Sequence, residues 1–227
     1  MKSSKPIRCR KKRKLKPAQL GQVYKTLRKA FGHQRWWPGD TPFEVMVGAI
    51  LTQNTAWTNV EKAIQNLKRA GALSFGSLRR ISQTKLSQLI RPAGYFNVKA
   101  DRLKHFMAFL HHECRGDLSK LRRRDMPALR EKLLAVKGIG PETADSILLY
   151  ALGKTSFVID AYTRRIFSRH GLAADTAGYE SWRGIFTRAL PAHLSLYNDY
   201  HAQIVQTAKT YCRKSPRCEA CPLRRFF

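Results

Sequence analysis

Apolar residues recur three and four positions apart along almost the whole chain, which is the spacing of one buried face of an α-helix. Two clear runs are Leu20, Val23, Leu27 and Phe31, then Val60, Ala63, Ile64 and Leu67. Breaks rich in glycine and proline separate such runs and predict about ten helices of ordinary length. No run alternates apolar and polar residues as a half-buried strand does. The sequence therefore predicts an all-α fold.

The charge of the chain is strongly one-sided. Its 227 residues include 43 Lys plus Arg against 15 Asp plus Glu, a formal net charge of +28. Such an excess favours a polyanionic partner, and nucleic acid is the first candidate. A membrane surface would attract the same charge, but no apolar stretch is long enough to cross a bilayer, so we expect no membrane association.

The first sixteen residues (1–16, MKSSKPIRCRKKRKLK) form a cationic segment without the apolar centre of a secretory signal. We expect a flexible basic arm that binds phosphates. A nuclear or organellar address has the same composition, whereas a bacterial chain would stay in the cytoplasm with the nucleoid. The sequence leaves these alternatives open.

A helix, a glycine turn and a second helix follow one another in the middle of the chain. Residues 126–136 have helical periodicity, and Lys137, Gly138, Ile139, Gly140, Pro141, Glu142 and Thr143 come next. Two glycines let backbone N–H groups point outward, and the second helix adds its positive N-terminal end, so the turn can hold one phosphate. An ordinary turn between two helices is the alternative.

A carboxylate follows an apolar run eighteen residues beyond Glu142. Asp160 directly follows the apolar segment Phe157-Val158-Ile159 and precedes another helical pattern. The position suits a carboxylate that faces a pocket, although capping of the next helix would explain it equally well.

Four segments in order resemble the endonuclease III-like members of the helix-hairpin-helix DNA glycosylase superfamily. They are ILTQNTAW, GYFNVKADRL, LLAVKGIGPETADSILLYAL and VIDAYTRRIFSRHGL, and the resemblance extends from about Trp36 to Cys221. It implies that Asp160 is the catalytic aspartate and that Gln53 enters the gap left by a flipped nucleotide. Contacts to DNA would come from Gln53, Lys137, Gly138, Ile139, Gly140, Glu142 and Thr143.

The resemblance also implies a fold of two lobes with a DNA-binding cleft between them. We expect a six-helix lobe over residues 40–153, which contains the hairpin. A second lobe would combine residues 17–39 with residues 154–227. The expected partner is double-stranded DNA with a damaged base, bound by a monomer.

The residue at one hairpin position separates two kinds of glycosylase. Bifunctional members of the family carry a lysine there, which attacks the sugar and supports strand cleavage, whereas this chain has Glu142. A carboxylate cannot form an imine, so we expect a monofunctional enzyme in which Asp160 stabilises positive charge on the sugar and orients water. Lys99 and Lys137 are the candidate substitute amines if lyase activity persists.

Three tryptophans suggest a stacking pocket for a base. The segments WWP, TPFEV and QNTAW are similar to the 3-methyladenine glycosylase branch, which implies that Trp36, Trp37 and Trp57 form the pocket, with Trp36 and Trp57 as the stacking pair. Aromatic faces attract cationic bases, so N-alkylated purines are the expected substrates. Packing in the protein core is the alternative for these side chains.

Three cysteines cluster near the end of the chain. Cys212, Cys218 and Cys221 resemble the family loop that binds a [4Fe–4S] cluster through four thiolates. The fourth position is occupied by Phe227. A cluster would therefore be completed by an unusual fourth ligand or by water, or would be labile, and loss of the cluster is the alternative.

Two other functions are compatible with these patterns. One is a bifunctional endonuclease III-like glycosylase and AP lyase that acts on oxidised pyrimidines. The other is a non-catalytic helix-hairpin-helix protein that binds DNA structure, although such a protein gains nothing from a carboxylate beside DNA.

Overall fold

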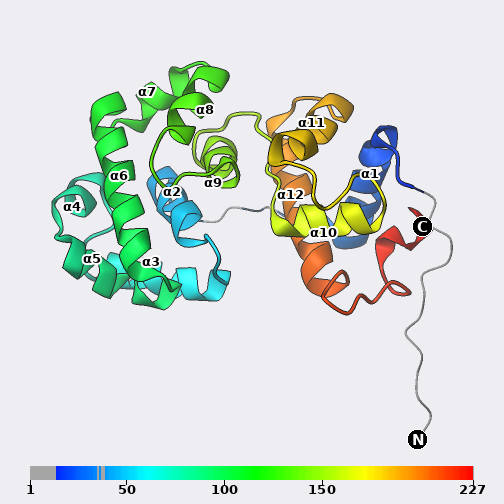
Figure 1. The fold of residues 1–227 in the computed structure, drawn as a ribbon, viewed down its shortest axis with the longest axis horizontal. Helices are drawn as coiled ribbons and strands as arrows, with labels where there is room; N and C mark the ends of the chain where they lie inside the picture. The colour runs from blue at the N-terminus through cyan, green and yellow to red at the C-terminus, as the bar shows by residue number, and fades with distance from the viewer. Residues whose placement is uncertain (1–13, 35, 37–38, 227) are drawn as a thin grey trace, which may run out of the picture. The chain divides into compact units, whose positions relative to one another are not determined.

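The computed structural model describes residues 14–34, 36 and 39–226, and every regular element among them is a helix. The all-α prediction is therefore confirmed for this part of the chain. The chain divides into two compact units (Figure 1): unit 1 combines Met1–Trp36 with Phe157–Phe227, and unit 2 is Trp37–Ser156. Each of the two boundaries between the units lies three residues from the boundary expected between the lobes. The DNA-binding cleft stays a prediction.

Unit 2 contains more helices than the six expected. They are α2 (Pro42–Leu51), α3 (Trp57–Arg69), α4 (Phe75–Arg80), α5 (Gln83–Leu89), the short 3-10 turn η2 (Arg91–Ala93), α6 (Phe96–Cys114), α7 (Leu118–Arg123), α8 (Met126–Leu134), α9 (Pro141–Ser146) and the π-helical segment η3 (Ile147–Ala151). The six-helix prediction is thus wrong for residues 39–156. Helices α4, α5 and α7 are only six or seven residues long, and Ser74, Ser82 and Asp117 cap the backbone N–H groups that begin them.

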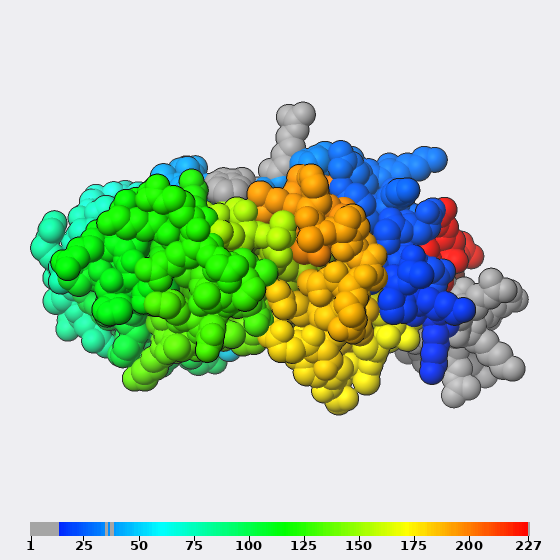
Figure 2. Space-filling view, turned by 90° about the horizontal axis from the view of Figure 1, so that it is seen from above, coloured from blue at the N-terminus to red at the C-terminus, as the bar shows by residue number. Residues whose placement is uncertain are grey.

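Helix α2 lies at the centre of unit 2. Apart from Glu44 in its first turn, its side chains are apolar, and Val45, Met46, Val47, Ile50 and Leu51 are buried. It packs against α3, α6, α9 and η3, while α6 also packs against α4 and α5 (Figure 1). Side chains fill the spaces between the ribbons (Figure 2). Because α2 is enclosed in this way, the residues that follow it are held against the hairpin and the start of α6.

Unit 1 is built on one long helix. Its elements are η1 (Pro17–Gln19), α1 (Leu20–Phe31), α10 (Ala161–Arg169), α11 (Tyr179–Ala189), α12 (Leu194–Thr210) and η4 (Pro222–Phe226). Helix α12 packs against α1 and α10 (Figure 1). The core is aromatic, with Phe157 stacked on Phe186 at 4.5 Å and edge-on to Tyr197 at 5.1 Å. This core fixes the segment that leads to Asp160.

Some expectations fall partly or wholly outside the described residues. The basic arm is described only from Lys14 to Lys16, and Trp37 and Phe227 are not described. Among the residues that are, no helix combines the length and apolar character needed to cross a membrane.

Candidate active site

The helix, turn and helix predicted around Gly138 are present as α8, residues 135–140 and α9. Gly138 has a φ of +88°, and a Cβ there would lie 2.3 Å from Cγ of Arg102, so both backbone and space require glycine. Gly140 precedes Pro141, the first residue of α9, and its missing side chain leaves open space. The backbone at the start of α9 is therefore open to a ligand from outside.

A buried ion pair joins the two arms of the hairpin. Arg130 of α8 donates two hydrogen bonds to Asp145 of α9, from Nε to Oδ1 at 2.8 Å and from Nη2 to Oδ2 at 3.1 Å. Ser156 Oγ donates to Oδ1 at 2.5 Å, and the Asp145 side chain is completely buried. This bidentate pair holds the turn in shape, and sequence reasoning missed it.

Gln53 lies against the hairpin. Its amide Nε2 donates to the carbonyl oxygen of Gly138 at 3.0 Å and to Thr143 Oγ1 at 2.9 Å, and Nη1 of Arg102 donates to its Oε1. The structure thus brings together three of the residues predicted to contact DNA, and adds Arg102. Insertion of Gln53 into DNA stays a prediction, and it would exchange these bonds for contacts to bases.

The two substitute amines for a lyase step are differently placed. Lys99 is buried at 1% exposure, and its Nζ donates to the carbonyl oxygens of Leu51 at 2.8 Å and Ala93 at 2.7 Å. Burial, and then the charge of Arg102, lower the pKa of Lys99 to about 8. Its amine donates hydrogen bonds to two backbone carbonyls and does not face solvent. Lys99 therefore connects α6 to the end of α2.

Lys137 and Glu142 both lie on the surface of the hairpin. The Lys137 side chain is 72% exposed, and its Nζ lies 3.4 Å from Asp101 Oδ2. Glu142 is exposed in the first turn of α9, where a carboxylate suits the positive end of the helix. Position 142, where the resemblance places the lysine of a lyase, is therefore exposed to solvent and carries a carboxylate.

Tyr95 is an exposed aromatic residue that the sequence did not single out. Its side chain is 72% exposed, and its backbone has a φ of +46° directly before α6. In the next two turns of that helix, Lys99 donates a hydrogen bond to Leu51 at the end of α2, and Arg102 donates one to Gln53. An exposed ring here can stack on a base. The family segment GYFNVKADRL contains the tyrosine, but nothing in its spacing shows which way the ring points.

Asp160 begins α10, as the helical pattern predicted. Its Oδ1 accepts hydrogen bonds from the backbone N of Thr163 at 2.6 Å and from Thr163 Oγ1 at 2.8 Å. The residues before it, Phe157, Val158 and Ile159, are buried at 1% exposure or less. The capping alternative is therefore confirmed, and it engages one of the two carboxylate oxygens.

The second oxygen of Asp160 faces a histidine of α12. Nε2 of His201 in α12 lies 3.5 Å from Oδ2, and the two side chains are 9% and 12% exposed. Burial raises the pKa of Asp160, but the attraction of His201 and the hydrogen bonds from Thr163 outweigh it, so the pKa is lowered. The carboxylate is thus kept ionised although it is buried.

The predicted base pocket is only partly described. Trp57 is half-buried at the start of α3, and its ring lies 3.5 Å from the position of a Cβ on Gly48. Trp36 is half-buried in unit 1, and Trp37 lies outside the described residues. Trp36 and Trp57 are thus each only half-buried, and their pairing across a base stays a prediction.

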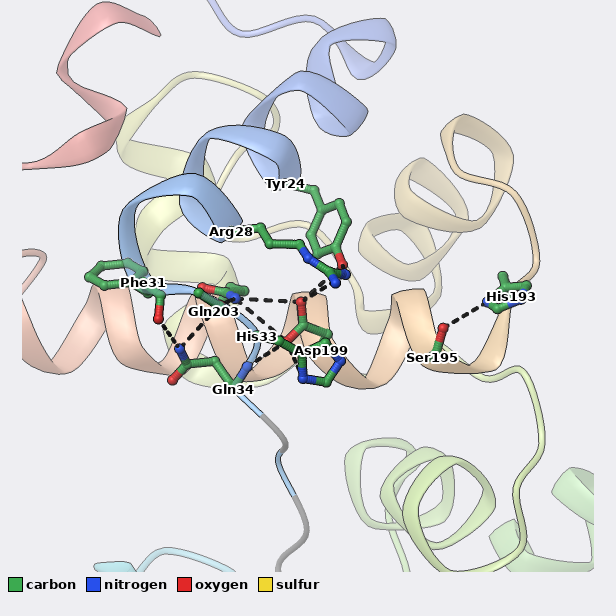
Figure 3. A network of polar contacts seen from close by, with 10 residues as sticks. Tyr24, Arg28, Phe31, His33, Gln34, His193, Ser195, Asp199 and Gln203 are labelled. Atoms are coloured by element: carbon green, nitrogen blue, oxygen red, sulfur yellow. Dashed lines mark hydrogen bonds and ion pairs between the residues drawn. The ribbon is translucent and has the colours of Figure 1, made fainter.

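The chain that leads to Trp36 is anchored on α12 by a polar network (Figure 3). Asp199 is 1% exposed, and its Oδ1 accepts from the backbone N of Gln34 at 2.9 Å while its Oδ2 accepts from Tyr24 Oη at 2.9 Å. Gln203 Nε2 donates to the carbonyl oxygen of Gly32 at 2.6 Å. One turn of α12 therefore fixes the segment just before the predicted stacking residue.

The cysteines do not form a ready metal site. Among the residues described, no three His, Cys, Asp or Glu side chains gather so as to hold a metal ion. Cys221 is buried, and Arg169 Nη1 donates to Cys212 Sγ at 3.3 Å and to the carbonyl oxygen of Arg213 at 2.7 Å. Arg169 therefore holds part of this loop, and the three thiols supply one ligand fewer than a four-thiolate cluster needs. The cluster stays a prediction, which bound iron and visible absorbance would test.

Comparisons with known proteins agree with the resemblance. The family model described as HhH-GPD superfamily base excision DNA repair protein matches residues 47–192. A Methanocaldococcus jannaschii protein, whose name describes an inferred DNA repair glycosylase, is 48% identical over 207 residues, which are 90% of this chain and 94% of the relative. Endonuclease III of Sulfolobus acidocaldarius is 28% identical over 183 residues, 80% of this chain and 79% of that one.

Two solved structures are similar in fold. An H. pylori 3-methyladenine DNA glycosylase bound to 1,N6-ethenoadenine has a TM-score of 0.75 at 28% identity, covering 86% of this chain and 98% of that chain. A non-covalent endonuclease III–DNA complex has a TM-score of 0.80 at 20% identity, covering 93% and 95%. The matched family model covers more than half of the sequence, including the hairpin and Asp160. The chain therefore belongs to the HhH-GPD superfamily of base-excision DNA repair proteins, as a DNA glycosylase.

Proposed function

We propose that this protein is a monofunctional glycosylase that hydrolyses the N-glycosidic bond of alkylated purines flipped out of duplex DNA. The observation that carries the proposal is Asp160, a buried carboxylate whose pKa is lowered and which is therefore ionised at neutral pH. The 28% identity to a 3-methyladenine glycosylase over 86% of the chain supports the substrate class.

The role of Asp160 is electrostatic. As the bond between C1′ and the base nitrogen breaks, its electron pair leaves with the base and positive charge develops on the sugar, which a nearby carboxylate stabilises. Water then forms the new bond to C1′ and gives up a proton to the carboxylate or to solvent. A cationic alkylated purine leaves as a neutral base, so no general acid is needed. The products are the free base and an abasic site.

The hairpin and its neighbours would hold the DNA. The open backbone at Gly140 and the start of α9 suit a phosphate, with Lys137 nearby as a positive charge. Gln53 and the exposed ring of Tyr95 are the proposed contacts to bases. These contacts recognise DNA as such, and the damaged base would be selected by the rings of Trp36, Trp37 and Trp57.

We expect the purified protein to release 3-methyladenine and 7-methylguanine from duplex DNA faster than thymine glycol or uracil. The reason is that aromatic faces attract a cationic base, and the cation leaves without protonation. Single-turnover base release from four duplexes, each with one of these lesions, measures the preference. Faster release of thymine glycol would support the endonuclease III-like alternative, and no release at all would support a protein that only binds DNA.

Borohydride should trap no covalent adduct between the wild-type protein and DNA. Glu142 cannot form an imine, Lys99 donates to two carbonyls, and Lys137 lies beside Asp101. The matched positive control is Glu142→Lys, which places an amine in the first turn of α9 and should give a trapped complex. A wild-type adduct that disappears in Lys137→Ala would instead assign lyase activity to that lysine.

A further inference from the structure

The two oxygens of the Asp160 carboxylate are held from two different helices. Thr163, three residues along in α10, donates twice to Oδ1. Oδ2 faces Nε2 of His201 in α12 at 3.5 Å. The bonds from Thr163 are the usual ones of a helix cap, whereas the contact with His201 joins residues far apart in sequence and has no capping role.

The surroundings make this contact important for the charge on Asp160. A buried carboxylate without a partner pays a large desolvation cost and tends to become protonated. Both residues are buried, so water reaches their side chains only slightly. His201 is the partner from outside α10 that favours the charged carboxylate.

Several other titratable groups on the helices around Asp160 make their contacts elsewhere. On α10, Arg164 donates to the carbonyl oxygen of Ala177 and Arg165 to that of Cys212. On α11, Arg183 lies 3.6 Å from Glu180 and Tyr179 accepts from the backbone N of Ile159. On α12, Asp199 bonds to α1 and to the segment that follows it, and the pKa of Tyr197 is raised by burial.

We propose that His201 is a positioning residue for Asp160, which holds Oδ2 in one orientation and in its charged form for the reaction at the sugar. The inference rests on the proposed function of Asp160 as the catalytic carboxylate. Thr163 and His201 together leave the carboxylate little freedom to rotate. An ionised group held in this way needs no reorganisation when positive charge develops beside it.

The test compares His201→Asn and His201→Ala in the wild-type and Asp160→Asn backgrounds. Asparagine keeps a hydrogen-bond donor at this position, and alanine removes it. His193→Asn is the matched control, because His193 is an exposed histidine directly before the same helix and bonds to Ser195 (Figure 3). Each protein is assayed for single-turnover base release across pH, for duplex affinity and for thermal stability.

We expect His201→Asn to lower base release about 10-fold and His201→Ala about 100-fold, with duplex affinity unchanged. The acid limb of the pH profile should move to higher pH in both, because burial then raises the pKa of Asp160 with less to oppose it. In the Asp160→Asn background the same changes should have no further effect on base release. His193→Asn should match the wild type.

An unchanged acid limb in correctly folded His201→Asn, or equal losses in both backgrounds, would overturn the inference. An NMR measurement that does not depend on activity tests the role of His201 separately from the proposed function. The ring signals of His201 in NMR spectra at one pH should change in Asp160→Asn more than those of His193. Base release by the wild type with unchanged His201 signals would reject the inference alone, whereas absence of release from every lesion would reject the proposed function and with it the role of His201.

Discussion

Replacement of Asp160 by Asn is expected to lower the rate of base release by about 10²-fold to 10⁴-fold. In the proposed mechanism, the substitution removes a negative charge from beside the sugar and removes the base that can accept a proton from water. Asparagine caps a helix as well as aspartate does, so α10 should remain folded. Single-turnover measurements on the preferred lesion give the rate, and duplex affinity measured in parallel should change little.

The control for this prediction is Asp175→Asn. Asp175 is an exposed carboxylate in the same unit, so its loss changes the net charge equally without touching the site. Its base release should equal that of the wild type. Equal activity of the Asp160→Asn protein would remove the catalytic assignment and leave Asp160 as a capping residue.

Loss of the ion pair between Arg130 and Asp145 should destabilise unit 2 by about 3–5 kcal/mol. Asp145 is fully buried, and Arg130→Met would leave its charge without the bidentate partner. Because the pair joins α8 to α9, the glycine turn between them should loosen, and duplex affinity should fall as well. Denaturant unfolding followed by circular dichroism measures the stability change.

The double variant Arg130→Met with Asp145→Leu tests whether the loss of stability comes from the unpaired charge of Asp145 or from changed packing. It removes both charges, so it should be more stable than Arg130→Met alone, although Ser156 then loses its acceptor. Arg79→Met, on the exposed surface of α4, is the control and should change stability by less than about 0.5 kcal/mol. Equal stability of wild type and Arg130→Met would show that the ion pair does not hold the hairpin.

Features set by neighbouring residues were predictable from the sequence. The glycine at 138 follows from a turn that needs a positive φ, and the helix start at Asp160 follows from a capping residue before a helical pattern. The six-helix lobe was expected from the family resemblance alone, because short helices such as α4, α5 and α7, with six or seven residues each, contain too little periodicity to separate them from a turn.

Features that join distant parts of the chain were not predictable in this way. His201 lies beyond α11 from Asp160, and its spacing gave no sign that it faces the carboxylate. Lys99 was considered as a free amine, since a lysine within a helix is normally exposed, and only the fold shows two carbonyls at its Nζ. Periodicity shows which face of a helix is buried, but the partner of each polar side chain depends on the tertiary fold.

Asp199 and His201 are two residues apart on α12, which places their side chains on roughly opposite sides of the helix. One side holds the backbone before Trp36, and the other holds the carboxylate of Asp160. For protein engineering, the proposed roles of Trp36 and Asp160 would make selectivity and turnover separable targets. A library restricted to Tyr24, Gln34 and Gln203 would alter the support of the proposed stacking ring while the reacting group keeps its own partners.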